Sequence, residues 1–264
     1  MLECVVNISE GNDPRLVRQL ADGLTQLLDI HSDADHNRSV FTLVGTEDVR
    51  RLSSAAIESL DIRHHAGEHP RLGVIDVVPF VALGKATGDE ALAARNDYAR
   101  WIVATHDVPV FLYGPERNLP DVRRGAWSTI SPDLGPGEPH PTAGAVCVGV
   151  REPLIAYNVA LESSDMDVAR AIAREIRRPG LRTLAFFVGG KAQISMNIVD
   201  AENVTVADAF DAVKHAAARR GIDSGAAELV GLVTEHHLRM NDETRWEELD
   251  LGIDKTIEFR SAKL

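Results

Sequence analysis

The chain has 264 residues, of which 44% are hydrophobic and 26% are charged, a composition typical of globular proteins with a substantial core. Asp and Glu number 40 against 28 Lys and Arg, so the formal net charge is −12 at pH 7. This negative charge argues against a nucleic-acid-binding or anionic-membrane surface, and an anionic ligand would need a local basic pocket.

The cysteines are Cys4 and Cys147, which lie far apart in apolar, strand-like runs. Neither a disulfide framework nor a thiolate zinc site is therefore suggested. No apolar run approaches the roughly 18 residues of a membrane span, and the N-terminus shows no signal-peptide pattern. We expect a cytoplasmic protein.

The first part of the chain alternates strand and helix patterns. Apolar runs predict strands over residues 2–8, 28–31, 39–44 and 74–80. Helices are expected after Asp13, with Pro14 at the first helical position, and over about 47–60 with Thr46 as the cap. The resulting order β-α-β-β-α-β is that of a ferredoxin-like layer, in which helices cover one face of an antiparallel sheet.

The rest of the chain repeats this alternation loosely. A helix over 89–106 and a strand over 108–113, placed at a sheet edge by Pro109, precede a Pro- and Gly-rich segment, 114–144. Further patterns predict strands over 145–150, 154–161, 183–188, 193–199 and 226–233, and helices over 165–178 and 205–220. We expect an α+β fold with subdomains 1–144 and 145–264.

The densest group of chemically active side chains is His-His-Ala-Gly-Glu-His-Pro-Arg-Leu-Gly, residues 64–73. Gly67 and Pro70 predict a loop, which is anchored to the buried strand that follows. His65 and His69 have the i, i+4 spacing of zinc-binding helices, but a loop cannot supply that helix and the His-Glu-x-x-His order is absent. The pattern favours acid–base chemistry by an imidazole that Glu68 orients.

Two other polar groups are open to two interpretations. His36-Asn37-Arg38 is either a solvated turn or an anion clamp with Asp33 and Asp35 beside it. Glu235-His236-His237 is better explained as the solvated start of a helix than as a site.

Several motifs match one family. They are Glu-Cys-Val-Val-Asn-Ile-Ser-Glu-Gly at 3–11, His-Asn-Arg at 36–38, Gly-Glu-His-Pro-Arg-Leu-Gly at 67–73, Asp-Val-Val-Pro-Phe at 76–80, Val-Phe-Leu-Tyr-Gly at 110–114, Gly-Ala at 144–145, Leu-Ile-Ala-Tyr-Asn at 154–158, Gln-Ile-Ser-Met-Asn at 193–197 and Glu-Leu-Val-Gly-Leu at 228–232. Over most of its length the chain resembles the formimidoyltransferases, which move a formimidoyl group from N-formimidoyl-L-glutamate to tetrahydrofolate in histidine degradation. We expect a stand-alone form, without the cyclodeaminase domain that is fused to animal members.

The resemblance implies two ferredoxin-like subdomains with a folate-binding tunnel between them, in a homodimer. Tetrahydrofolate would be the co-substrate, no metal is expected, and His69 would be the catalytic base. The family's folate-contacting residues correspond to Gly135, Pro136, Gly137, Glu138, Pro139, His140, Pro141, Thr142, Ala143 and Gly144, and to Glu175, Ile176 and Arg177.

Substrate contacts follow from the chemistry of the transfer. A cationic formimidoyl group favours a carboxylate nearby, from Asp35 or Glu68, and the glutamate carboxylates of both substrates favour guanidinium groups. The candidates for substrate binding are Asp35, Asn37, Arg38, Arg63, Glu68 and Arg71. Two alternatives stay open: a non-catalytic folate-binding protein, and a metal-dependent hydrolase that uses the histidine loop.

Overall fold

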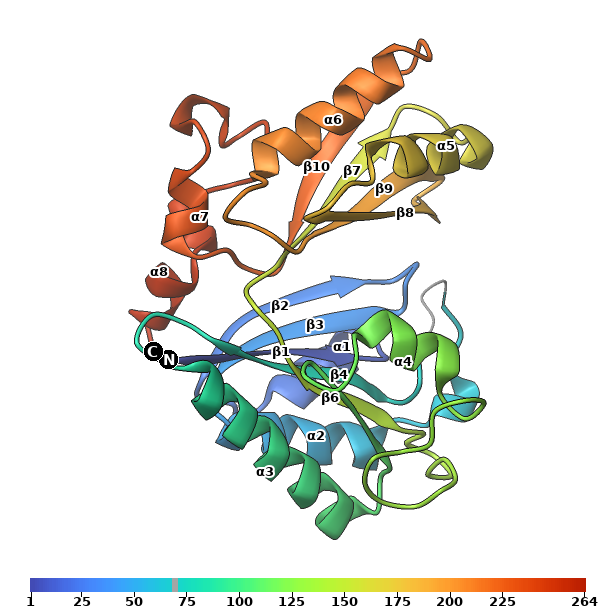
Figure 1. Cartoon of the computed structure of the whole chain (residues 1–264), viewed down its shortest axis with the longest axis vertical. Helices are drawn as coiled ribbons and strands as arrows, with labels where there is room; N and C mark the ends of the chain where they lie inside the picture. Colours follow the sequence, from blue (N-terminus) through green and yellow to red (C-terminus); the bar gives the residue numbers. More distant parts are fainter. Residues whose placement is uncertain (68–70) are drawn as a thin grey trace. The chain divides into compact units, whose positions relative to one another are not determined.

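The structure is a computed structural model that describes residues 1–67 and 71–264. It divides into two compact units, Met1–Glu152 with Leu264, and Pro153–Lys263. Each unit combines one sheet with helices (Figure 1), so the expected α+β class is confirmed.

The first unit opens with the predicted β-α-β-β-α-β order. Its elements are β1 (Leu2–Ile8), α1 (Pro14–Ala21), β2 (Leu27–Asp33), β3 (Arg38–Val44), α2 (Glu47–Ser59) and β4 (Ile75–Ala82). The strands lie in the order β2-β3-β1-β4 with every neighbouring pair antiparallel, which is the ferredoxin-like arrangement.

Side chains around the ends of α1 and α2 define where these helices begin. The Asp13 carboxylate accepts hydrogen bonds from the backbone N–H groups of Arg15 and Leu16, as an N-cap does. Thr46 occupies the N-cap position of α2, as predicted, but its side chain makes no capping hydrogen bond. The Asp48 carboxylate instead accepts from the backbone N–H groups of Thr25 and Gln26 and thereby ties α2 to the start of β2.

The same sheet continues with parallel strands. After α3 (Gly88–His106) come β5 (Val110–Tyr113), α4 (Leu119–Gly125) and β6 (Val146–Val150). β6 pairs in parallel with β4 and with β5, and β5 is an edge strand, as Pro109 predicts. We expected β6 to open the second subdomain at 145, but its pairing places it in the first sheet, and the units divide after Glu152.

Around β4 the first sheet is covered on both faces. Alternating residues of β4 show this: Val78 and Phe80 pack in a core with residues of α1, α2 and α3, whereas Val77 packs with Phe111 and with Val122 of α4. Near-continuous apolar strands such as β4 are typical of sheets that are buried on both sides.

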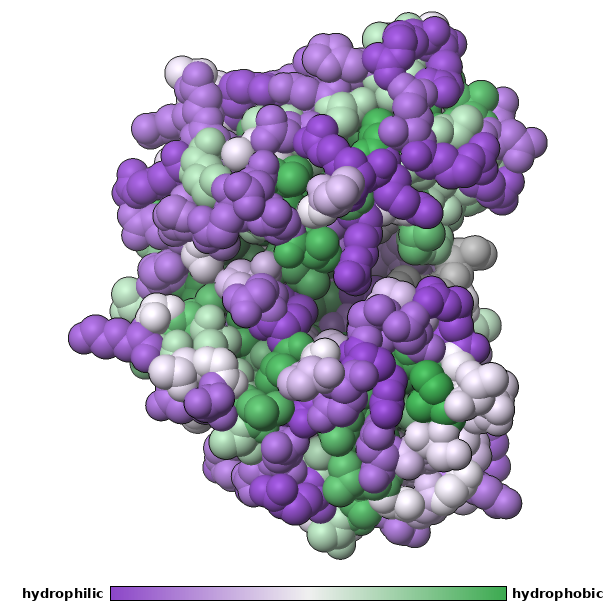
Figure 2. All heavy atoms as spheres, viewed as in Figure 1, coloured by the Kyte–Doolittle hydropathy of each residue, from purple (hydrophilic) through white to green (hydrophobic). Residues whose placement is uncertain are grey.

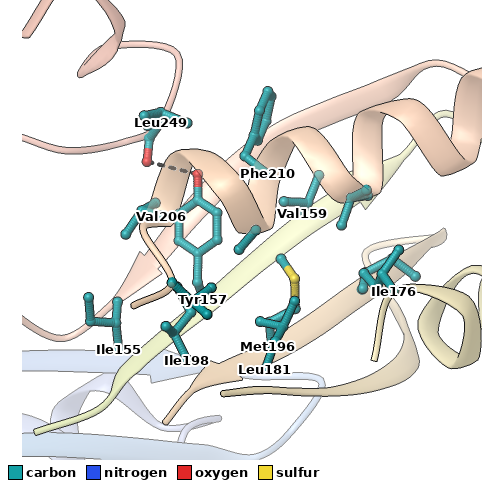
Figure 3. Packing of buried hydrophobic residues seen from close by; sticks show 14 of the residues in the cluster. Ile155, Tyr157, Val159, Ile176, Leu181, Met196, Ile198, Val206, Phe210 and Leu249 are labelled. Carbon is teal, nitrogen blue, oxygen red and sulfur yellow. Dashed lines mark hydrogen bonds between the residues drawn. The ribbon is translucent and has the colours of Figure 1, made fainter. Parts of the chain in front are cut away.

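The second unit repeats the ferredoxin-like order. It contains β7 (Ile155–Leu161), α5 (Met166–Ile176), β8 (Leu181–Val188), β9 (Lys191–Ile198), α6 (Val206–Ala218) and β10 (Ser224–Val230), with the strands in the antiparallel order β10-β7-β9-β8. Thr205 and Asp208 form the predicted capping box of α6. Figure 3 shows α6 lying over β7, and Val206 and Phe210 of α6 belong to the same buried cluster as Tyr157 and Val159 of β7.

The C-terminal segment completes this second core. It contains the helix α7 (Glu235–Arg239), the 3₁₀ turns Glu243–Arg245 and Ile253–Lys255, and the helix α8 (Ile257–Ser261). The buried Tyr157 hydroxyl donates to the Leu249 carbonyl at 3.0 Å (Figure 3), and Leu249 is itself fully buried. The tail is therefore part of the core of the second unit.

The polar character of the surface agrees with the high content of charged residues in the chain. The face drawn in Figure 2 is covered mainly by hydrophilic residues, with hydrophobic residues in small groups between them. None of the helices in the described ranges combines the length and the apolar character needed to cross a bilayer.

Candidate functional site

The site lies in the first unit, where loops from distant parts of the sequence meet beside the sheet. The loop after β1 is the first of them. Ser9 Oγ donates to the Gly73 carbonyl at 2.7 Å, and the Gly11 backbone N–H donates to Asn37 Oδ1 at 2.9 Å. A Cβ on Gly11 would lie 2.4 Å from the Asp33 carbonyl oxygen, so only glycine permits this close approach to the β2–β3 turn.

Asn37 connects three of these loops. It is buried in the turn between β2 and β3 and has φ of +46°, a conformation that asparagine tolerates better than most residues. Its Oδ1 accepts from Gly11, while its Nδ2 donates to the Ala66 carbonyl at 2.9 Å and lies 3.2 Å from His65 Nδ1. The Gly11 and Ala66 bonds fix which way the amide points.

This orientation determines the tautomer of His65. Because the Asn37 amide nitrogen is a donor, His65 Nδ1 must accept, and the proton of the neutral ring then resides on Nε2. Nε2 is buried and makes no well-formed hydrogen bond to a described residue. Burial lowers the pKa of His65 and the Arg71 charge lowers it further, against the opposing effects of Glu10 and the Ser9 backbone. His65 is therefore a neutral ring that carries its proton on the buried Nε2, on the side of the Ser9 backbone.

Arg71 holds the same turn in place. Its Nη1 donates to the Asn37 carbonyl at 2.9 Å and its Nη2 to the His36 carbonyl at 2.8 Å. Gly67 packs beside these groups, because a Cβ there would lie 2.5 Å from the His36 carbonyl oxygen. The described residues of the histidine loop therefore pack against the turn at 36–38. The sequence did not predict this contact.

Asp76 is the charged centre beside this turn. Its carboxylate is buried, forms an ion pair with Arg123 of α4 and accepts from the Leu72 backbone N–H at 2.9 Å. Burial alone would lower the pKa of Arg123, but Asp76 outweighs it and the pKa is raised. Arg38 and Arg71 also lie within electrostatic reach of both Asp76 and Arg123.

Arg38 is the group here that best fits an anionic ligand. Burial, opposed by Asp76, lowers its pKa to about 10, so it stays charged near neutral pH. Its Nε is buried without a hydrogen-bond partner among the described residues. A buried donor of this kind is rare in folded proteins, and a ligand carboxylate would satisfy it.

The predicted folate loop reaches this site only through its C-terminal part. The Ala145 N–H donates to the Leu72 carbonyl at 3.0 Å and the Val74 N–H to the Ala143 carbonyl at 2.9 Å. Gly144 has φ of +72°, and a Cβ there would lie 2.3 Å from the Leu72 carbonyl oxygen. Gly135, at the other end of the loop, packs against Val103 instead.

Other predicted site residues lie apart from this cluster. Asp35 is exposed in the β2–β3 turn, and the exposed Arg63 pairs with Asp61. Glu68, His69 and Pro70 lie outside the described residues.

Three predicted folate contacts belong to the second unit, at the end of α5. Glu175 pairs with Arg219 and Arg220, and Ile176 is buried in the core. Arg177 Nη2 donates to the Thr183 carbonyl at 2.6 Å.

Sequence reasoning missed four residues of the cluster. Ser9, Gly11 and Asp76 occur in the motifs that we recognised, but nothing in their spacing marks their contacts. Arg123 sits in a charged segment that resembles an ordinary solvated helix. An apolar strand interrupted by one aspartate, as at Asp76, is the signal that could have indicated a buried cation partner.

Comparison with known proteins defines the class. A family model described as the N-terminal subdomain of the formiminotransferase domain matches residues 1–151, and a model described as the formiminotransferase domain matches residues 156–246. The chain belongs to the formiminotransferase family.

Individual relatives agree with this assignment. The chain is 36% identical to a glutamate formimidoyltransferase of Streptococcus pyogenes serotype M1 over 92% of this chain and 94% of that protein. A glutamate formimidoyltransferase of Thermoplasma acidophilum is 33% identical over 90% of this chain and 89% of its own length. A formimidoyltransferase-cyclodeaminase of Rattus norvegicus is 30% identical over 88% of this chain but only 50% of the rat protein.

Proposed function

We propose that this chain is a glutamate formimidoyltransferase, which moves the formimidoyl group of N-formimidoyl-L-glutamate to tetrahydrofolate in histidine degradation. The observation that carries the proposal is the cationic cluster beside the Asn37–His65 pair, in a chain that two similar glutamate formimidoyltransferases match over most of its length. We also expect a cytoplasmic homodimer, as the family resemblance implies.

The cluster suits a substrate that carries carboxylates. The guanidinium groups of Arg38, Arg71 and Arg123 lie around the carboxylate of Asp76, and the Asp33 carboxylate also acts on Arg38. The local excess of positive charge contrasts with the net charge of −12 for the whole chain. In our proposal Arg38 binds a glutamate carboxylate directly, and Arg71 mainly positions the turn that carries it.

The transfer needs proton movements at two nitrogens. As the amine of reduced folate attacks the formimidoyl carbon, that amine loses a proton, and the departing glutamate nitrogen gains one. A single imidazole can serve both steps, and we assign this role to His69. The orientation of His65 supports the assignment, because a ring whose Nδ1 already accepts from Asn37 offers a donor rather than a base.

We assign hydrogen bonding of the substrate to the Nε2–H group of His65. Its lowered pKa keeps the ring neutral near pH 7, so it donates without adding charge beside a cationic formimidoyl group. Glu68 or Asp35 then supplies the compensating carboxylate, Arg63 contributes a further guanidinium group, and no metal takes part in the transfer.

Folate is assigned to the loop Gly135–Gly144 and, less directly, to Glu175 and Arg177. The backbone contacts of Ala143 and Gly144 with Leu72 and Val74 support the first part, because they attach the loop to the histidine segment. Ile176 is a weaker candidate, since its side chain packs in the core of its own unit. Slower amide exchange over 135–144 on adding tetrahydrofolate is the expected result, and unchanged exchange there would contradict it.

The central experiment is a transfer assay with purified protein, N-formimidoyl-L-glutamate and tetrahydrofolate. We expect His69→Ala to lower turnover by roughly 10²-fold to 10⁴-fold, the range for removing an acid–base group, while folate still binds. His64→Ala is the matched control, because the His64 side chain is 82% exposed, and it should leave turnover within about twofold of the parent.

The outcomes separate the alternatives. Folate binding without any transfer by the parent protein would indicate a non-catalytic folate-binding protein. Loss of activity on chelation, restored by zinc, would indicate a metal-dependent enzyme. Near-normal turnover of His69→Ala with an inactive His65→Ala would move the base to His65.

A further inference from the structure

A second group of polar side chains lies in the second unit and takes no part in the function proposed above. Within the described part of the chain, Glu202, His236 and His237 bring one ligand atom each to within 4.8 Å of one another. His236 Nε2 lies 3.1 Å from one carboxylate oxygen of Glu202, and His237 Nε2 lies 3.2 Å from the other. These residues come from the turn before α6 and from the first turn of α7.

The local structure fixes one of the two imidazoles. The sequence suggested that Glu235-His236-His237 begins a solvated helix, and α7 does begin at Glu235. His237, however, has a side chain only 6% exposed, whereas that of His236 is 64% exposed. His237 Nδ1 lies 2.7 Å from the hydroxyl of Thr234, so the ring is held with Nε2 towards Glu202.

We propose that Glu202, His236 and His237 form a binding site for a borderline divalent cation such as Zn²⁺. The spacing fits this coordination: ligand atoms at about 2.0–2.1 Å from a tetrahedral zinc lie about 3.3 Å apart, close to the present nitrogen–oxygen separations. Two imidazole nitrogens and a carboxylate favour Zn²⁺ and its neighbours over Mg²⁺ or Ca²⁺, which prefer oxygen ligands.

The Thr234–His237 contact is the feature that distinguishes this group from a simple ion pair. A metal-binding imidazole almost always donates its second N–H to a fixed partner, which sets the tautomer and the direction of the ring. In the structure Nε2 faces the Glu202 carboxylate and donates to it, so Nδ1 accepts from the Thr234 hydroxyl. In the metal-bound form Nε2 would bind the ion, and Nδ1 would carry the proton and donate it to the Thr234 hydroxyl.

The chemistry of the three side chains agrees with this arrangement. A neutral imidazole and an ionised carboxylate are the forms that bind a divalent cation. The protein supplies one nitrogen or oxygen atom from each of the three residues, and water would fill the remaining position of a four-coordinate ion.

Such a site would cross-link two segments that the backbone joins only through a long path. Glu202 lies in the turn that leads into α6, and both histidines lie in α7, after β10. A bound ion would hold the turn against α7 and slow the opening of both. The role is one of stability, and it is independent of transfer at the site in the first unit.

The test is isothermal titration of the metal-stripped full-length protein with ZnCl₂. We expect one equivalent to bind, and we expect His236→Ala and Glu202→Gln each to weaken that binding by at least about 100-fold. Both residues are largely exposed, so these variants should fold normally. His215→Ala is the matched control, because His215 is an exposed histidine of the same unit outside the group, and it should bind as the parent does.

A second measurement reports on the coordination itself. Co²⁺ bound in place of Zn²⁺ should give visible absorption of four-coordinate intensity, and Thr234→Val should weaken binding by about 10-fold to 100-fold while Thr234→Ser restores it. The proposal is overturned if the parent binds no zinc, or if the equivalent it binds survives in both His236→Ala and Glu202→Gln, which would place the ion elsewhere.

Discussion

Replacing Asp76 by asparagine should destabilise the first unit strongly, because it removes the charge that compensates buried guanidinium groups. The side chains of Asp76 and Arg123 are only 4% and 17% exposed, so solvent screens their ion pair weakly. Removing one partner of a buried pair costs about 3–5 kcal/mol. Asparagine still accepts the Leu72 N–H, which places the expected loss near the lower limit, about 3 kcal/mol.

Thermal and urea denaturation of the purified variant measure this loss. For a unit of this size, about 3 kcal/mol corresponds to a fall in melting temperature of roughly 6–12 °C. Arg124→Gln is the matched control on the same helix: Arg124 is 72% exposed and pairs with Asp121 on the surface, so the change should cost no more than about 0.5 kcal/mol.

A double variant tests the reason for the loss. If Asp76→Asn lowers stability because it leaves the buried Arg123 charge without a partner, adding Arg123→Met should recover part of the lost stability. Methionine fills similar space without a charge. A loss below about 1 kcal/mol in Asp76→Asn, or losses that simply add in the double variant, would refute the account of this pair.

Gly11→Ala should destabilise the first unit by about 1–3 kcal/mol, because its Cβ would meet backbone atoms of the β2–β3 turn at 2.4 and 2.5 Å. Gly88→Ala, with open space around the new Cβ in the first turn of α3, should be neutral or slightly stabilising, and equal urea midpoints for the two variants would contradict this. Burial is the chief reason why the pKa values of His65, His106 and His237 are lowered in the folded protein. At a pH near the ordinary histidine pKa of about 6.5, the unfolded chain therefore binds more protons than the folded one. The free energy of unfolding should therefore fall as pH drops from about 7 to 5.5; an unchanged urea midpoint over that range would be evidence against these shifts.

The sequence predicted local structure better than it predicted partners. Strands such as β7 and helices such as α3 follow from apolar periodicity and capping residues, which act within a few positions along the chain. The position of β6 in the first sheet could not be predicted in this way. Its parallel pairing with β4 joins segments about seventy residues apart, and no local pattern indicates such a pairing. The short helix α4 was missed within a Pro- and Gly-rich segment.

The candidate site shows the same division. A loop rich in histidine was evident from composition, and the structure brings its His65 to Asn37 of the turn at 36–38. The pair of Asp76 and Arg123 could not be predicted, since each residue alone is ordinary. The role of His69, the folate tunnel and the dimer stay predictions.

The hydrogen bond between Tyr157 and Leu249 joins two segments that leave the ribosome at different times. β7, which carries Tyr157, leaves the ribosome 92 residues before Leu249. Domains tend to fold from the N-terminus as they emerge, so the first unit can close while the second waits for the segment that contains Leu249. Until that segment emerges, the tyrosine hydroxyl lacks its native acceptor, and termination of translation before Leu249 would release a chain whose second unit cannot complete its core.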